Sequence, residues 1–184
     1  RYSLLVIAAL LFGCEAADIV DPEVEVPETQ LQKKTFTTES TNEGYIYFNF
    51  ASETTAQIDS PANSLEWDIA FNLTTIKVNG GTSGPGAGAV AMLSGVNFED
   101  ITAVPDNVTF VSDDSTSTGF AIPTGTDSGW YHYTGPPNHW ILPIADRVFI
   151  FRTADGKFAK VRFLAYYSTG LAPTEVQQLD SGYY

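Results

Sequence analysis

Residues 147–164 read RVFIFRTADGKFAKVRFL, two segments rich in β-branched and aromatic residues that flank an Asp-Gly pair. Asp-Gly between two such segments is a strong signal for a β-hairpin, because the tight turn needs residues that tolerate a positive φ. Five of the nine basic residues of the chain lie in this stretch: Arg147, Arg152, Lys157, Lys160 and Arg162. We expect them to form cross-strand charge pairs on a solvated face. A site for the carboxylate groups of a ligand is the alternative.

The segments upstream of this hairpin also have the composition of strands. Residues 45–50 form a compact aromatic and β-branched run, which predicts a strand. Residues 67–73 alternate between apolar and polar side chains, and the apolar phase then slips by one residue at Ile76 and Val78. We therefore expect a β-bulge near Thr74-Thr75. Because no stretch has a sustained helical period, the sequence predicts an all-β, antiparallel domain with one core.

The glycine-rich residues 79–88, NGGTSGPGAG, are similar to a phosphate-binding loop in glycine spacing alone. A dinucleotide-binding loop needs a helix after it, and a P-loop ends in Gly-Lys-Ser/Thr. Here the loop leads into residues 89–93, AVAML, which have the composition of a strand. The segment is therefore predicted to be a mobile hairpin connection.

Composition excludes several classes of function. The chain carries 22 acidic and 9 basic residues, and its net charge of −13 repels nucleic acid and anionic lipid. Its single Cys excludes a disulfide framework and a structural zinc site built on Cys ligands. Most carboxylates lie in turn-forming Asp/Ser/Thr loops, and no Ser occupies a nucleophile elbow, so a glycosidase or a Ser hydrolase is disfavoured. We expect a protein that is not an enzyme.

The N-terminal residues have the features of a lipoprotein signal. Residues 1–13 are mostly apolar but shorter than the roughly 20 residues that span a bilayer, which predicts a signal peptide whose start is truncated. Leu11-Phe12-Gly13-Cys14 resembles a bacterial lipobox, so Cys14 is the expected lipidation site. Residues 14–34 are then a flexible acidic tether and residues 35–184 the β domain. At the other end, the SGYY of residues 181–184 is typical of the start of a strand, so we expect this fragment to lack its final strand.

Both histidines lie in residues 129–140, GWYHYTGPPNHW, among four aromatic residues. Such a cluster suits a flat aromatic ligand, because imidazole is a common axial ligand of haem iron and aromatic rings stack on a macrocycle. On this hypothesis His132 and His139 are candidate ligands, and the candidate packing residues are Trp130, Tyr131, Tyr133 and Trp140. The alternative is that His132 lies on a strand and His139 in a loop, with Trp130 and Trp140 in the core or at its rim.

The order of these motifs resembles that of the HmuY family. The resemblance rests on Trp67-Asp68-Ile69-Ala70-Phe71, the glycines after Asn79, Gly129-Trp130 and the hairpin of residues 147–163, and it covers roughly residues 45–167. It implies an all-β domain, anchored to the outer membrane by lipid or shed, that binds haem and passes it to a TonB-dependent receptor.

The resemblance also bears on the choice of haem ligands. Haem-binding members use a pair of His or Met side chains from loops between the glycine-rich region and the hairpin. A count along the chain places Gly135 where the second ligand would fall, and Gly cannot ligate. His132, His139 and Met92, the only Met of the chain, are the candidates, and we expect no metal besides haem iron. The alternative function is a HmuY-like scaffold without haem that binds a glycan or a protein partner.

Overall fold

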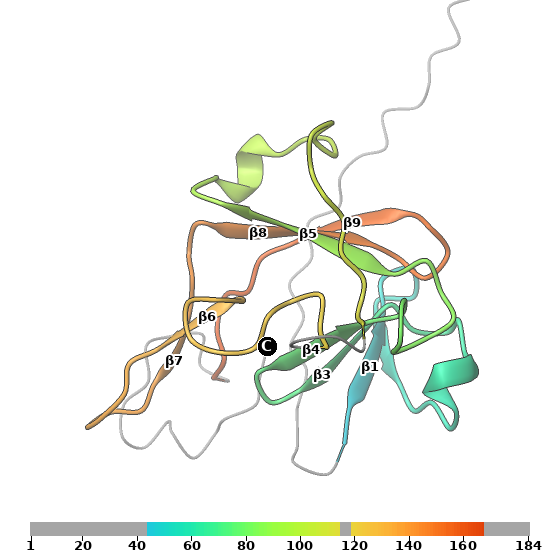
Figure 1. Ribbon diagram of the computed structural model, residues 1–184, viewed down its shortest axis with the longest axis horizontal. Helices are drawn as coiled ribbons and strands as arrows, with labels where there is room; N and C mark the ends of the chain where they lie inside the picture. Colours follow the sequence, from blue (N-terminus) through green and yellow to red (C-terminus); the bar gives the residue numbers. More distant parts are fainter. Residues whose placement is uncertain (1–43, 115–118, 168–184) are drawn as a thin grey trace, which may run out of the picture. The chain divides into compact units, whose positions relative to one another are not determined.

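Residues 44–114 and 119–167 are described by the computed structural model, and within them every regular element is a strand or a single 3-10 turn (Figure 1). The elements in chain order are β1 (Ile46–Asn49), β2 (Thr54–Ala56), η1 (Pro61–Asn63), β3 (Ile69–Asn72), β4 (Thr75–Val78), β5 (Ala89–Ser94), η2 (Phe98–Asp100), β6 (Tyr131–Tyr133), β7 (Ile141–Pro143), β8 (Arg147–Arg152) and β9 (Phe158–Val161). The predicted all-β, antiparallel fold is confirmed. The predicted signal peptide, Cys14, the acidic tether and the missing final strand concern parts of the chain outside the described residues.

The described strands form three antiparallel sheets. Their orders are β2-β1-β3-β4, β5-β8-β9 and β6-β7. The predicted hairpin of residues 147–164 is β8 and β9, which pair from Phe149↔Val161 to Arg152↔Phe158. Gly156 has a φ of +86° in the turn between them, as the Asp-Gly pair predicts.

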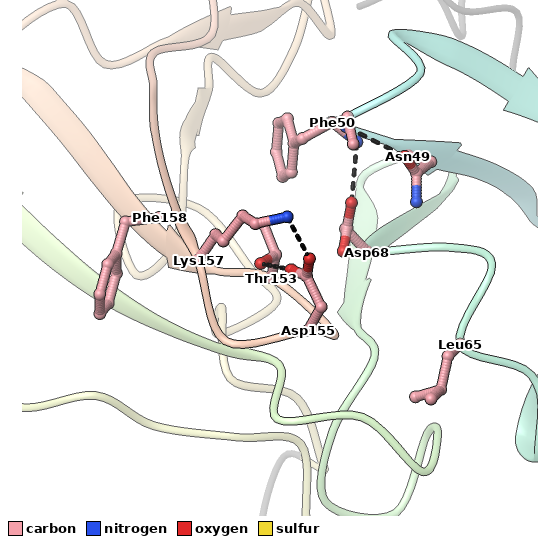
Figure 2. Close-up of a pocket in the computed structure, with 9 residues that line it drawn as sticks. Asn49, Phe50, Leu65, Asp68, Thr153, Asp155, Lys157 and Phe158 are labelled. Carbon is pink, nitrogen blue, oxygen red and sulfur yellow. Dashed lines mark hydrogen bonds and ion pairs between the residues drawn. The ribbon is translucent and has the colours of Figure 1, made fainter. Parts of the chain in front are cut away.

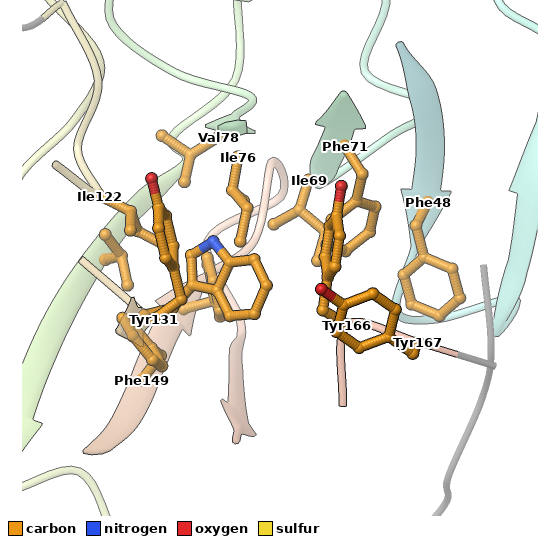
Figure 3. Close-up of a cluster of buried hydrophobic side chains, with 13 residues drawn as sticks. Phe48, Ile69, Phe71, Ile76, Val78, Ile122, Tyr131, Phe149, Tyr166 and Tyr167 are labelled. Atoms are coloured by element: carbon orange, nitrogen blue, oxygen red, sulfur yellow. The ribbon is translucent and has the colours of Figure 1, made fainter. Parts of the chain in front are cut away.

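The main core lies between the two larger sheets and extends to the start of the third (Figure 3). Alternate residues of each strand face it, because successive side chains of a strand project to opposite faces. The members are buried apolar and aromatic side chains: Phe48, Ile69, Phe71, Ile76, Val78, Val90, Ile122, Trp130, Tyr131, Phe149, Phe151, Tyr166 and Tyr167. A smaller cluster of Ala91, Val148 and Ile150 lies on the other face of β5 and β8, under apolar side chains of residues 96–110.

The apolar phase slip after Leu73 is a chain reversal, not a bulge. β3 and β4 pair directly, with Phe71 opposite Ile76 and Ile69 opposite Val78. Leu73 has a φ of +48°, which allows the two-residue turn. Residues that pair across two strands share a face of the sheet. Because Ile69 pairs with Val78 and Phe71 with Ile76, the core-facing residues have odd numbers before the turn and even numbers after it. The prediction of a bulge was therefore wrong.

The glycine-rich loop is not a hairpin connection, since β4 and β5 belong to different sheets. It folds around Asn79, whose side chain is fully buried. The Asn79 amide donates to the carbonyls of Ser64 (2.9 Å) and Trp67 (2.7 Å) and accepts from the N–H of Gly86 (3.1 Å). A Cβ at Gly86 or Gly88 would lie 2.6 or 2.3 Å from the carbonyl oxygen of Asn79. The glycines let the backbone of the loop approach the backbone of Asn79 this closely, and the prediction of a hairpin was wrong.

Two buried aspartates join segments that are distant in the sequence. Asp68 accepts from the N–H of Phe50 and of Ala154, both at 2.8 Å, and so links the end of β1 to the β8–β9 turn. Asp113 accepts from the N–H of Val78 at 3.1 Å and of Ala121 at 2.7 Å. Burial raises the pKa of Asp113, because it penalises the charged form.

Candidate functional site

The β6–β7 hairpin carries both histidines and lies to one side of the two larger sheets (Figure 1). Its strands pair from Tyr131↔Pro143 to Tyr133↔Ile141. The connecting loop is closed by bonds from Thr134 N to the Trp140 carbonyl (3.0 Å) and from Trp140 N to the Thr134 hydroxyl (2.9 Å). This ribbon therefore holds its loop in a defined conformation.

His132 lies on β6, and its ring has a carboxylate partner. Its Nδ1 is 2.8 Å from Oδ1 of Asp127, while Nε2 has no hydrogen-bond partner among the described residues. Both side chains are accessible to solvent, with exposed fractions of 50% for His132 and 64% for Asp127. The hydrogen bond from His132 is the main cause that lowers the pKa of Asp127. A His whose Nδ1 is held by a carboxylate is the usual arrangement of a metal-ligating imidazole.

His139 lies in the loop of the hairpin, with a φ of +55°. Its Nδ1 contacts the hydroxyl of Tyr133, and the two rings lie 5.8 Å apart at 38°. A tyrosine hydroxyl can donate to Nδ1 or accept from it, so this partner leaves the tautomer of His139 open. His139 is therefore the weaker of the two candidate ligands.

The hairpin does not bring the two imidazoles together as a pair. His132 and Tyr133 are neighbours on β6, so their side chains project to opposite faces of the ribbon. His139 contacts Tyr133 and lies on the side of that residue. Each face of the ribbon consequently offers one imidazole, and two axial ligands to a single iron do not come from this hairpin alone.

The aromatic candidates divide between the core and the surface. Trp130 is 1% exposed, donates from Nε1 to the carbonyl of Thr74 at 2.9 Å, and packs with Tyr131 in the main core. Neither ring is accessible to a ligand in this conformation. For Trp130 this agrees with the alternative interpretation, which placed it in the core or at its rim. Tyr133 is exposed, and Trp140 is half-buried. Of the four candidates, Tyr133 and Trp140 are therefore the two that are accessible to a ligand.

Met92 lies in another sheet. It is on β5 opposite Phe149 of β8, and 39% of it is exposed. No described contact joins it to either histidine, so the structure does not group the three candidate ligands into one site.

The basic residues of the β8–β9 hairpin bind backbone carbonyls and rings. Arg152 donates to the carbonyl of Ala87 at 2.7 Å. Lys160 donates to the carbonyls of Phe98 (2.6 Å) and Ile101 (2.8 Å), and its Nζ lies 4.0 Å from the centroid of the Phe98 ring. These contacts hold neighbouring segments against the sheet. Cross-strand charge pairing was the wrong explanation for these two residues, whose described partners are carbonyls and the rings of Phe98 and Phe110.

A pocket of about 260 Å³ lies between the turn after β1 and the β8–β9 turn (Figure 2). Lys157 and Asp155 form an ion pair at 2.6 Å on its wall, which with the Thr153 hydroxyl lowers the pKa of Asp155 to about 2. Ligand pockets usually measure about 300–1,000 Å³, so this one is small for a macrocycle. Its lining contains none of the candidate ligands.

Asp127, the residue that gives His132 its distinct environment, was not among the predicted site residues. Thr126-Asp127-Ser128-Gly129 is recognisable as a turn from its composition, and that signal places a carboxylate within reach of a strand beginning at Tyr131. It does not show which side chain of the strand the carboxylate meets. Among the described residues, no group of three or more His, Cys, Asp or Glu side chains could hold a metal ion.

The fold and this ribbon define an antiparallel all-β domain with a solvent-exposed imidazole and aromatic surface. In the part of the chain that the structure describes, no helix has the length and apolar character needed to cross a membrane. The family model for HmuY protein matches residues 41–176. The chain belongs to the HmuY family. A comparison with curated proteins gives no match.

Proposed function

We propose that this domain binds haem, without catalysis, on the β6–β7 hairpin, with Nε2 of His132 as an axial ligand to the iron. The observation that carries the proposal is the 2.8 Å contact between Nδ1 of His132 and Asp127, which occupies Nδ1 and leaves Nε2 of this exposed side chain for a ligand. Membership of the HmuY family supports haem as the ligand. Bound haem would supply an iron that imidazole ligates and a flat ring that aromatic side chains can cover.

The residues fit one axial ligand and a partial aromatic surface. His132 offers the ligand, and the half-buried ring of Trp140 is the packing candidate. The exposed ring of Tyr133 projects from the opposite face of β6 and would not cover the same ligand. His139 and Met92 remain candidates for a second ligand, although no described contact places either of them on the same side of the ribbon as His132.

A titration with ferric haem tests the proposal. We expect a saturable shift of the Soret band in the wild type and loss or strong weakening of the shift in His132→Ala. His139→Ala and Met92→Ala test the two candidates for a second ligand, and a weaker shift in only one of these variants would identify that residue as the second ligand. Asp106→Gly, at an exposed aspartate in another turn, is the control and should match the wild type. A wild type without a saturable shift, or a His132→Ala variant equal to the wild type, contradicts the proposed site.

The cellular setting of this proposal is a lipid-anchored protein of the outer membrane, displayed at the surface or shed, that delivers haem to a TonB-dependent receptor. It rests on the lipobox at Cys14 and on the family. Cys14→Ser in the complete gene should abolish incorporation of labelled palmitate and release the protein from the membrane fraction. Palmitate incorporation that survives this change contradicts Cys14 as the lipidation site.

A second candidate function is binding of a glycan or a protein partner by the same ribbon without haem. The observation that favours it is the placement of the two imidazoles on opposite faces, which does not supply the pair of ligands used by haem-binding members. Binding to an outer-membrane polysaccharide or receptor, with no haem spectrum, would support this function over the first.

A further inference from the structure

The turn before β6 holds Asp127 in a conformation that few residues adopt. Its φ is +63°, in the left-handed region where glycine, asparagine and aspartate are the usual residues. Two backbone contacts hold it there: its N–H donates to the carbonyl of Tyr131 at 2.9 Å, and its carbonyl accepts from Nη1 of Arg147 at 3.1 Å. Arg147 also contacts the carbonyl of Gly129 and belongs to β8, so the turn is tied to the sheet that forms one side of the core.

A directional chain of hydrogen bonds orients the carboxylate of Asp127. The N–H of Tyr133 donates to the hydroxyl of Thr126 at 2.8 Å, and this hydroxyl donates to Oδ2 of Asp127 at 3.3 Å. Oδ1 is then the oxygen that faces Nδ1 of His132 at 2.8 Å. An ionised carboxylate can only accept, so the proton of this bond belongs to Nδ1 of the imidazole.

We infer that Asp127 is a positioning residue that holds neutral His132 as the Nδ1–H tautomer, so that the lone pair of Nε2 is the one presented for coordination. This inference rests on the proposed function, because it assigns a role to Asp127 in the same site. The carboxylate also limits rotation of the ring, since turning it would break the bond to Oδ1. His139, whose partner is a hydroxyl, has no such constraint.

The tautomer can be read in the haem-free protein from long-range ¹H–¹⁵N NMR correlations of the two imidazoles. We expect the Nδ1–H form for His132 in the wild type and in Asp127→Asn, whose amide oxygen can still accept from Nδ1. In Asp127→Gly the ring should populate the Nε2–H form as well. Both substitutions suit a left-handed backbone, so the turn is expected to fold. Asp106→Gly, at an exposed aspartate in another turn, is the matched control.

Haem affinity gives the second readout. Loss of an outer-shell partner of a metal-ligating His typically weakens binding about 10–100-fold, and we expect about 10-fold for Asp127→Gly because the pair is exposed. Asp127→Asn should recover most of the affinity, and Asp106→Gly should match the wild type.

The two hypotheses fail differently. A wild type that binds no haem refutes the proposed function, whatever the tautomer. A wild type that binds haem while His132 is Nε2–H in the free protein refutes the role of Asp127, as does an Asp127→Gly variant with unchanged tautomer and affinity. Loss of binding in Asp127→Asn equal to that in Asp127→Gly would show that the charge acts rather than the hydrogen bond, and this also overturns the inference.

Discussion

Replacing Asn79 with Ala should remove about 3 kcal/mol from the free energy of unfolding, although the residue lies in a loop. The substitution eliminates three hydrogen bonds at once, two donated to the carbonyls of Ser64 and Trp67 and one accepted from Gly86. The carbonyl of Trp67 is buried, and leaving such a group unsatisfied costs about 1–3 kcal/mol. The other two groups are partly buried, so water can replace their bonds at about 1 kcal/mol each or less.

A loss of this size is a large share of the roughly 5–15 kcal/mol that stabilises a typical domain. Urea denaturation followed by tryptophan fluorescence measures it, with a lower midpoint and an unchanged m-value expected. Asn79→Asp keeps an acceptor for Gly86 but turns a carboxylate toward two carbonyls, so it should be at least as destabilising as Asn79→Ala. Asn107→Ala, at an exposed position, is the control and should change stability by less than about 0.5 kcal/mol.

A cost below about 1 kcal/mol for Asn79→Ala would contradict the predicted loss, because one unsatisfied buried carbonyl alone accounts for that much. An Asn79→Asp variant as stable as the wild type would contradict it as well. Either result would mean that the glycine-rich loop does not depend on this side chain for its fold, and the loop would then be open again to a role in ligand binding.

Three further predictions follow from the core and its junctions. Trp130→Ala should cost about 3–5 kcal/mol in urea denaturation, since the indole is buried, and a cost near zero would contradict its place in the core. Gly81→Ala should destabilise more than Gly95→Ala: both have a left-handed φ, which costs Ala about 1–2 kcal/mol, but only at Gly81 would the Cβ meet a backbone atom, 1.6 Å from the carbonyl oxygen of Asp113. Equal losses in the two variants would refute the clash. Burial raises the pKa of Asp113, so the folded chain binds this proton more tightly than the unfolded chain, and stability from this group increases as the pH falls. As the pH falls from neutral toward 3.8, the ordinary pKa of an aspartate, the difference in unfolding free energy between wild type and Asp113→Asn should therefore shift in favour of the wild type, and a shift in the opposite direction would contradict the linkage.

Local turn chemistry explains which hairpins the sequence could predict. Asp155-Gly156 provides a residue with a φ of +86°, and the β8–β9 hairpin was predicted from it correctly. The two connecting residues of the β3–β4 turn are Leu73, with a φ of +48°, and Thr74. Neither is Gly, Asn or Asp, so they gave no turn signal, and the change of core-facing positions was interpreted as a bulge. Here the pairing of Ile69 with Val78 and of Phe71 with Ile76 in the core overrides the weak turn preference.

The candidate site was only partly predictable from the sequence. The cluster of His132, His139 and their aromatic neighbours is visible in the sequence, but its members lie on different faces of the ribbon, because consecutive residues of a strand project to opposite faces. The assignment of Trp130 to the core and of Asp127 to His132 depends on contacts between separate segments.

By itself the sequence determined the all-β class and the β8–β9 hairpin, because side-chain alternation, β-propensity and an Asp-Gly turn act over a few residues. The order of its motifs carried the resemblance to the HmuY family. Only the tertiary structure decided which imidazole has a carboxylate partner, which aromatic rings are buried, and why the glycine loop closes on Asn79. Those outcomes depend on hydrogen bonds and packing between distant segments, such as the bond from Ala154 to Asp68 across 86 positions. Such contacts form only when the sheets have packed, and no local pattern encodes them.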